Sequence, residues 1–451
     1  MLAMKKLYLL LSVVFFTSAI NAQFIPPNPN EGLLGGGLGV TWIDGAPYYS
    51  FHLFPEASFG KFGVGLDLKL EYGANGKIRT ENFNEFSDYL SVIRYVRYGQ
   101  KKDPVYVRLG ALDYATLGHG SIVYLYNNRP SYDVRKIGLV FDLDMGNYGF
   151  ESIYSAFGEA GVFGLRGYAR PLQFTTLKDI PIIGMTEVGV TIAGDLHDKA
   201  GVVAGNYNST TDEFTATTDE GAITIIGLDV GFPLLRTRAF DLDFYVDATK
   251  IIGFGSGAAT GFYANFKGLG LLDIKARIER RFNGDQYLSS YFGPMYEIER
   301  FNLNKGSGAV SSKVQQLKAA GSGGNGYYGE MLATVLNTFY ILGSFQKLDK
   351  DPNSGVLHLS TEIAPDGFPY VARAGYDKIY IQDFGDIFTT DDRSHLYAEV
   401  GYKPMPYIIC SLVYHWTFTP IRDADDNVLE FKTQRKVEPR ISFVYPISVG
   451  N

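Results

Sequence analysis

Hydrophobic residues recur at every second position over long stretches of this chain, and this period constrains the fold more than any other feature of the sequence. In 241–248, three aspartates and a tyrosine share one side, while leucine, phenylalanine, valine and alanine share the other. Successive side chains of a β-strand point to opposite faces, so such a stretch predicts a strand with one polar and one apolar face. The clearest predicted strands are 66–71, 137–144, 241–248, 273–281 and 439–449.

A soluble β-sandwich or propeller would show the same alternation, but three features favour a membrane barrel. Many predicted strands reach about ten residues, against a usual length of about five or six. The pattern continues to the C-terminus without a helical domain. Aromatic residues also cluster near the predicted strand ends, where barrels carry girdles at the membrane interfaces. The clusters are Tyr48/Tyr49, Tyr95/Tyr98, Tyr124/Tyr126, Tyr291/Phe292, Tyr327/Tyr328 and Tyr414/Trp416.

These features predict an all-β fold, a closed antiparallel transmembrane β-barrel. Turn signals such as Asn75-Gly76 and Asn283-Gly284 separate the predicted strands. Counting them gives about 16 strands, within a range of roughly 14–18, and closed single-chain barrels favour an even number.

Composition agrees with a barrel and excludes several other classes. Charged residues make up 20% of the 451 residues, below the soluble average of about 25%. No run of 18 apolar residues follows the N-terminus, which argues against helical membrane spans. The net charge of −7 argues against nucleic acid as a partner. The only cysteine is Cys410 and the six histidines show no paired spacing, so we predict no disulfide, metal site or other cofactor.

The first residues predict a secretory signal peptide over 1–22. Lys5 and Lys6 precede an apolar stretch, 7–17, that is too short to span a bilayer. Ala22 is the expected last residue before cleavage, with Ala19 as a second possibility and a buried N-terminal helix as the alternative interpretation. We therefore expect residues 23–451 to form a single barrel domain in the bacterial outer membrane, with membrane lipid as its surroundings.

Charged residues at strand-interior positions should face the lumen, because Arg or Lys facing lipid near the midplane costs about 2–4 kcal/mol. Two arrangements are open. Opposed basic and acidic walls could line a water-filled pore, or the charges could pair across strands and fill a closed interior. The Arg-rich stretch 94–170 and the acidic stretch 241–247 favour opposed walls. The predicted lumen-lining residues are Arg94, Arg108, Arg135, Arg166, Asp241, Asp243, Asp247, Lys275, Arg277 and Glu279.

Two long polar segments, 195–220 and 301–326, interrupt the strand pattern. We expect mobile external loops, although one of them could fold into the lumen as a constriction. Within the second, Val314, Leu317 and Lys318 have the spacing of one short amphipathic helix.

No catalytic motif is complete, so we do not expect an enzyme. His119 and Ser121 are the only candidates for a hydrolase, and they lack the Gly-x-Ser-x-Gly spacing. A role at a loop or a strand end is the better interpretation of both residues.

With its signal peptide, Tyr-rich alternating strands and aromatic final strand, the chain resembles outer-membrane β-barrel proteins of Gram-negative bacteria. The Ala22-Gln23 junction is similar to cleavage sites of the Bacteroidetes lineage, and segments 107–112, 116–120 and 126–128 resemble uncharacterised barrels of such bacteria. The ending, Val449-Gly450-Asn451, differs from the C-terminal Phe of many barrels. The resemblance implies a location and a fold but supplies no functional residues.

The leading functional hypothesis is a porin-like channel for passive passage of small hydrophilic solutes. A non-transporting barrel, as a structural anchor or a partner for another envelope protein, is the alternative, and a plugged lumen would favour it. Transport of fatty-acid-like molecules is a variant of the first hypothesis that needs an apolar pocket and an opening in the wall.

Overall fold

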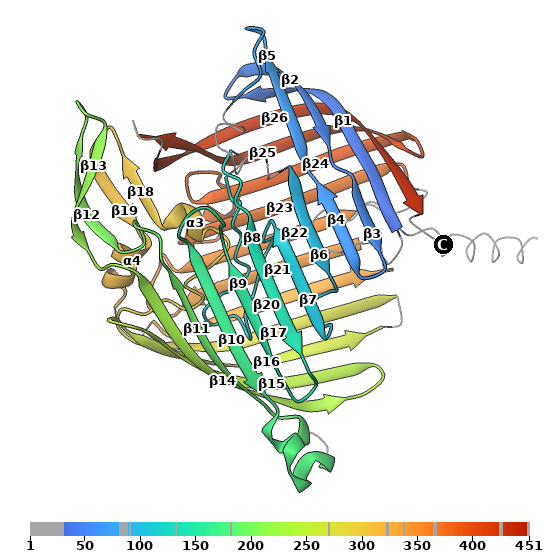
Figure 1. Ribbon diagram of the computed structural model, residues 1–451, viewed down its shortest axis with the longest axis vertical. Coiled ribbons are helices and arrows are strands. Elements are labelled where there is room, and N and C mark those ends of the chain that lie inside the picture. The colour runs from blue at the N-terminus through green and yellow to red at the C-terminus, as the bar shows by residue number, and fades with distance from the viewer. Residues whose placement is uncertain are drawn as a thin grey trace, which may run out of the picture.

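The computed structural model describes residues 31–80, 89, 92–131, 133–180, 183–268, 271–321, 324–336, 339–363, 368–423 and 427–448. The predicted signal peptide lies outside these residues. The described part is dominated by strands, and all pairs of named strands are antiparallel (Figure 1). The first half of the main sheet contains β1 (Glu31–Ile43), β2 (Ala46–Leu53), β3 (Glu56–Phe59), β4 (Phe62–Leu66), β5 (Leu68–Gly73), β6 (Ile93–Tyr98), β7 (Val105–Gly110), β8 (Gly138–Asp144), β9 (Tyr148–Tyr154), β10 (Val162–Ala169) and β11 (Glu187–Asp195).

The second half of the main sheet follows in chain order, and two small hairpins lie outside it. Its strands are β14 (Ile223–Arg236), β15 (Phe240–Ile251), β16 (Ser256–Lys267), β17 (Leu272–Asn283), β20 (Gly326–Val335), β21 (Phe339–Leu348), β22 (Gly355–Ile363), β23 (Tyr370–Ile381), β24 (Ser394–Met405), β25 (Ile408–Arg422) and β26 (Val428–Ser448). The hairpins are β12 (Val202–Asn208) with β13 (Glu213–Asp219), and β18 (Phe301–Asn304) with β19 (Ala309–Ser312).

The first strand of the main sheet also pairs with the last. β1 pairs with β2 from Gly36↔Leu53 to Ile43↔Ala46, and with β26 from Glu31↔Ser448 to Ile43↔Lys436. The prediction of an all-β antiparallel fold is confirmed.

The predicted count of about 16 strands is wrong, because the described residues form 26 strands, 22 of them in the main sheet. Interruptions split two strands, so that β2 and β3 lie in succession beside β1, and β4 and β5 flank Asp67. Short strands such as β6 and β7 also carry too few residues for their alternation to be counted.

The two rims of the barrel differ in the length of their connections. One rim carries the start of β1, the end of β26, tight turns such as 145–147, 237–239 and 406–407, and a longer connection, 170–186; we call it the short-turn rim. The opposite rim carries 111–137, 196–222 and 284–325; we call it the long-loop rim. In outer-membrane barrels, short turns face the periplasm and long loops face the exterior.

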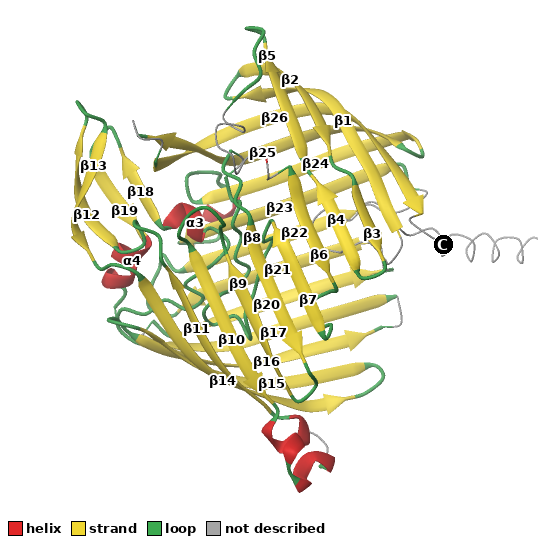
Figure 2. Cartoon of the chain, viewed as in Figure 1, coloured by secondary structure: helices red, strands yellow, loops and turns green. Residues whose placement is uncertain are grey.

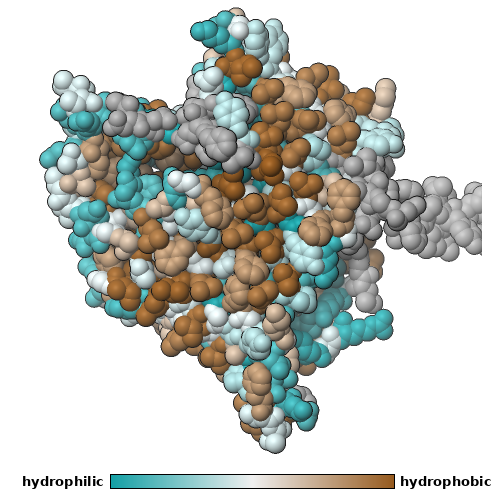
Figure 3. Space-filling view, in the orientation of Figure 1, coloured by the Kyte–Doolittle hydropathy of each residue, from teal (hydrophilic) through white to brown (hydrophobic). Residues whose placement is uncertain are grey.

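The outer surface of the wall is apolar. Leu38 and Ile278 are 65% and 67% exposed, and hydrophobic side chains gather over the strands that face the viewer in Figure 3. On β17 the neighbours of Ile278 are buried charges, Arg277 and Glu279. A wall with apolar residues outside and polar residues inside is the inverse of a soluble barrel and suits lipid surroundings.

The helices of the described residues lie in the connections between strands (Figure 2). No described helix has both the length and the apolar character needed to cross a membrane. The described helices are η2 (Pro171–Phe174), η3 (Thr176–Asp179), η4 (Ile183–Met185), α3 (Tyr296–Glu299), α4 (Lys313–Ala319) and η5 (Asp386–Phe388).

The largest hydrophobic core lies inside the barrel, between the wall and two segments from the long-loop rim. We call these segments, 111–137 and 284–319, the interior plug. Val123, Tyr126, Phe292 and Leu317 belong to this core together with wall residues such as Val140. The expectation that 301–326 is only a mobile external loop is therefore wrong, because α4 forms as predicted but buries Val314 and Leu317 in the core.

Candidate functional site: two cavities across an interior plug

At the end of β7, a glycine allows the chain to leave the barrel wall and enter the plug. Gly110 has φ +125°, and a Cβ built there would lie 2.3 Å from the carbonyl oxygen of Arg94. The chain then turns inward, with Ala111 N–H donating to that same oxygen at 2.8 Å. Only glycine fits both the backbone angle and the close approach.

The two plug segments bind each other through backbone hydrogen bonds. Tyr124 N–H donates to the Phe292 carbonyl at 3.1 Å, and Phe292 N–H donates to the Ile122 carbonyl at 3.1 Å. Ser290 N–H donates to the Ser121 carbonyl at 2.8 Å. The plug therefore forms a single packed unit.

A buried ion network ties this unit to the wall. Arg300 donates from both terminal nitrogens to Glu297 at 2.8 Å and from Nε to Asp195 at 2.5 Å. Glu297 also accepts from Lys136 at 2.6 Å and from the hydroxyl of Tyr126. Burial raises the pKa of Glu297, but the charges of Arg300 and Lys136 outweigh it and lower that pKa to about 2. Glu297 is thus ionised over the whole working range of pH.

A second attachment joins the plug to β15 through Asp247. The Nδ1 atom of His119 lies 2.7 Å from Asp247 Oδ1, and Ser121 Oγ donates to Asp247 Oδ2. The His119 ring stacks on Tyr245 with 4.3 Å between centroids. Burial lowers the pKa of His119, but the hydrogen bond and charge of Asp247 outweigh it, so the net shift is upward.

This geometry does not resemble a hydrolytic triad. Ser121 and His119 both bind the same carboxylate, and no hydrogen bond between the two is found among the described residues. In a triad the histidine must accept the serine proton. The two residues instead attach a loop to the wall.

Most predicted lumen-lining charges face inward, and most are paired. Arg94 and Arg108 both contact Asp113 of the plug, at 3.2 and 2.8 Å. Burial raises the pKa of Asp113, but the two guanidinium groups outweigh it and the net shift is downward. Arg166 binds Asp229 through Nε and Nη2 at 2.9 and 2.6 Å. These residues therefore pair across strands and with the plug. They do not form opposed charged walls around an open pore.

The remaining predicted residues lie on β15 and β17 or on the plug. Asp241 pairs with Lys267 at 2.6 Å and Asp243 with Arg236. Lys275 shares a face of β17 with Arg277 and Glu279 but is exposed. Arg135 was predicted within a strand and is instead a plug residue, with Nη1 donating to the Asp67 carbonyl at 3.1 Å.

Two cavities lie on either side of the plug. Cavity 1, about 870 Å³, is lined by short-turn-rim residues such as Lys102 and by Arg166, Tyr245 and Arg277. Cavity 2, about 370 Å³, is lined by residues near the long-loop rim such as Asp351, and by Arg281 and Tyr328. Both volumes are in the range of small-molecule sites. A polar cavity of about 290 Å³ and a mainly apolar one of about 870 Å³ lie elsewhere against the plug.

Cavities 1 and 2 share two lining residues, Tyr124 and Leu125. The hydroxyls of Tyr328 on β20 and Tyr124 are hydrogen-bonded to each other, and the guanidinium of Arg277 lies over both rings, 4.6 Å from the centroid of Tyr124 and 4.5 Å from that of Tyr328. We call these four residues the partition. Leu125 has φ +48°, an unusual backbone angle for a branched side chain and one that concentrates at functional sites.

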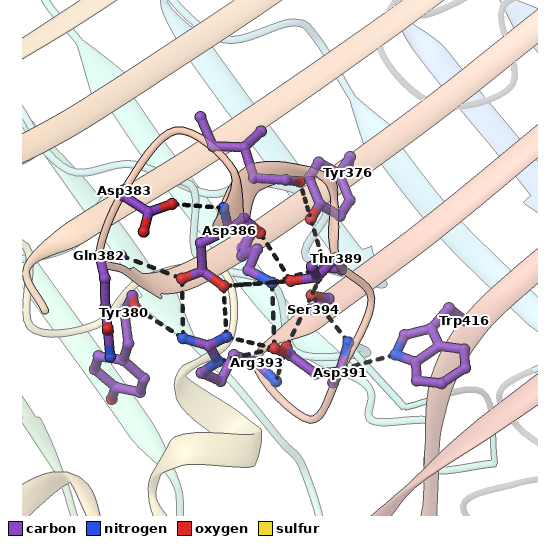
Figure 4. A network of polar contacts seen from close by, with 12 residues as sticks. Tyr376, Tyr380, Gln382, Asp383, Asp386, Thr389, Asp391, Arg393, Ser394 and Trp416 are labelled. Carbon is purple, nitrogen blue, oxygen red and sulfur yellow. Dashed lines mark hydrogen bonds and ion pairs between the residues drawn. The ribbon is translucent and has the colours of Figure 1, made fainter.

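A polar network orders part of the long-loop rim (Figure 4). Arg393 donates to Asp386 at 2.7 Å and to Asp391 at 2.5 Å, which fixes the loop between β23 and β24. Tyr380, at the base of this loop, donates to Glu299 of α3 at 2.5 Å. The outer end of the plug is therefore attached to the rim.

Sequence reasoning missed the partition residues Tyr124 and Tyr328, which were predicted in interfacial girdles. Both are buried, whereas the adjacent Tyr327 is 60% exposed. The sequence did contain a signal for Tyr328. It directly follows Tyr327, and two consecutive residues of a strand cannot both face lipid.

Among the described residues, no group of three or more His, Cys, Asp or Glu side chains could hold a metal ion. No protein-family model matches the chain, and no curated protein matches its sequence.

Solved structures of outer-membrane proteins resemble the chain only distantly. Wzi, an outer membrane protein involved in group 1 capsule assembly in Escherichia coli and described as a carbohydrate-binding β-barrel, aligns at 11% identity and a TM-score of 0.36, covering 92% of this chain and 84% of Wzi. OccK11 of Pseudomonas aeruginosa aligns at 10% identity and a TM-score of 0.29, covering 92% and 95%. CdiB of Acinetobacter baumannii aligns at 8% identity and a TM-score of 0.29, covering 93% of this chain, which spans 61% of CdiB. Likeness at this level assigns no function.

Proposed function

We propose that the chain is a closed barrel of the bacterial outer membrane that passes small hydrophilic solutes through a gated interior. The pairing of β1 with β26 supports closure, and the apolar outer surface supports a place in lipid. No catalytic residue and no cofactor is needed for this function.

The observation that carries the proposal is the partition shared by the two cavities. Cavity 1 reaches the short-turn rim and cavity 2 the long-loop rim, and the side chains of Tyr124 and Leu125 line both. A path across the barrel therefore requires displacement of a few side chains rather than removal of the whole plug. Among the described residues, four of the nine non-glycine residues with positive φ lie in the plug (Tyr114, Leu125, Gln286 and Ser290).

Single-channel recording in planar bilayers tests the proposal. The wild-type protein should show rare openings, and Tyr124→Ala should raise the open probability at least several-fold, because it removes one ring of the partition. Tyr327→Ala is the matched control, since this tyrosine neighbours the partition in sequence but is exposed on the outer surface. A folded wild-type protein and a folded Tyr124→Ala variant that both stay silent would refute gated passage.

A non-transporting barrel is the second candidate, and the packed plug favours it. The long hairpin β25–β26 adds to this packing, because Leu429 near its tip packs with Phe301 and Leu303 of β18. Under this hypothesis, weakening the partition changes no conductance.

A further inference from the structure

Arg277 is a buried guanidinium with one unused hydrogen-bonding edge. Arg277 is 6% exposed, and it lines cavity 1. Nη1 donates to the carbonyl of His119, while Nε and Nη2 have no hydrogen-bond partner among the described residues. The nearest carboxylates, Glu279 and Glu330, are 4.0 Å from Nη1 and Nη2 respectively, beyond hydrogen-bonding distance.

The unused atoms form the fork that recognises a carboxylate. Nε–H and Nη2–H point in parallel along one edge of a guanidinium and bind both oxygens of a carboxylate at once. Arg166 in the same barrel uses this edge for Asp229, at 2.9 and 2.6 Å. Arg277 presents the same edge with no protein carboxylate on it.

The surroundings fix this fork in place. The Cζ atom of Arg277 lies 4.6 Å from the centroid of the Tyr124 ring and 4.5 Å from that of Tyr328. Nε and Nη2 are enclosed by these surroundings, so a carboxylate reaches them only when the partition residues move. Buried donors of a charged group that lack a partner are costly, and an acceptor that enters the cavity relieves that cost.

We propose that Arg277 binds the carboxylate of a small organic acid that enters cavity 1. This inference rests on the proposed function and deepens it, because it names the class of solute. Beyond the partition, Arg281 offers a second donor: its Nη2 has no partner among the described residues, and it lines cavity 2. Both guanidinium groups contact the ring of Tyr328, so a carboxylate released by Arg277 meets Arg281 next.

Isothermal titration calorimetry of the refolded full-length protein in detergent tests the site without requiring transport. Acetate is the probe, and acetamide is its neutral counterpart of the same shape. Wild type should bind acetate and not acetamide, and Arg277→Gln should weaken acetate binding about tenfold or more, since a charge-assisted bidentate contact is lost. Arg277→Lys should weaken it less, because it keeps the charge but loses the fork. Lys275→Gln, on the same face of β17 and exposed, should bind within about twofold of wild type.

Glu330 provides a second variant. Its Oε2 lies 4.0 Å from Arg277 Nη2 and accepts from the hydroxyl of Tyr328 at 2.8 Å. Glu330→Gln removes a competing negative charge, so acetate binding should tighten. The shift of the folded band between boiled and unboiled gel samples verifies that each variant is a folded barrel.

Three results would overturn the inference: no acetate binding by wild type, equal binding of acetamide, or wild-type affinity in a folded Arg277→Gln variant. The two proposals fail separately. If Tyr124→Ala conducts but acetate does not bind, passage stands and the carboxylate site fails. If acetate binds as expected but no variant conducts, the site stands and passage fails.

Discussion

Arg300 is the residue on which the attachment of the plug to the wall most depends, and its removal gives a measurable result. Arg300 is 4% exposed and makes three charge-assisted hydrogen bonds, one to Asp195 of β11 and two to Glu297. Arg300→Met removes all three and fills a similar volume. Breaking a buried ion pair by removing one partner costs about 3–5 kcal/mol.

For Arg300→Met we expect a cost in the lower part of this range of about 3–5 kcal/mol. Glu297 keeps Lys136 at 2.6 Å, and Asp195 keeps the hydroxyl of Tyr296 at 2.8 Å, so neither carboxylate is left without a donor. We expect the free energy of plug opening to fall by about 3 kcal/mol, which is a little over a hundredfold in the opening equilibrium at 1.4 kcal/mol per tenfold.

Hydrogen exchange at the amides of Tyr124 and Phe292 measures this opening, because both join the plug segments and neither belongs to the wall. Both should exchange about a hundredfold faster in Arg300→Met, while strand amides stay protected. Lys318→Gln is the control, since Lys318 pairs with Glu220 near the surface and such pairs contribute about 0–1 kcal/mol. Exchange in Arg300→Met within threefold of wild type would refute the view that this network holds the plug.

Three further predictions concern pH, the backbone and the lipid-facing surface. The pKa of His119 is raised from 6.5, so its ion pair with Asp247 stabilises the plug below that value and is lost as pH rises through the raised pKa; conductance should increase as the pH rises above 6.5 in wild type but not in His119→Gln. Gly110→Ala should lower the free energy of unfolding in denaturant titration by about 1–3 kcal/mol, and by more than Gly146→Ala, which has positive φ but open space around it. Leu38→Arg should destabilise the barrel in lipid vesicles by about 2–4 kcal/mol if it lies near the midplane, and a loss below about 0.5 kcal/mol would contradict a lipid-facing position.

The wall was predictable because alternation is a local signal. Stretches 137–144, 241–248 and 273–281 coincide with β8, β15 and β17, and in β17 the charged side faces inward as the cost of charge in lipid requires. The strand count was not predictable in the same way. β6 and β7 have six residues each, too few for a period of two to stand out.

The plug was not predictable because its structure depends on partners far away in the chain. Val123 pairs with Phe292, and Tyr126 bonds to Glu297, 171 positions later. Nothing local distinguishes segment 111–137 from an external loop, since its turns and aromatic residues occur in both. Arg135 was assigned to a strand for the same reason, although it lies in the plug and donates to the carbonyl of Asp67 between β4 and β5.

The aromatic pairs show that one elementary rule would have allowed a further prediction from the sequence. Adjacent residues of a strand point to opposite faces, so Tyr327 and Tyr328 cannot both belong to a membrane girdle. One ring must enter the interior, and a large ring with a hydroxyl buried there needs a hydrogen-bonding partner. The hydroxyl of Tyr328 is hydrogen-bonded to that of Tyr124, and the guanidinium groups of Arg277 and Arg281 lie over the Tyr328 ring. Interior tyrosines of this kind predict an interior that is filled rather than open, and in this barrel they mark the position at which the two cavities meet.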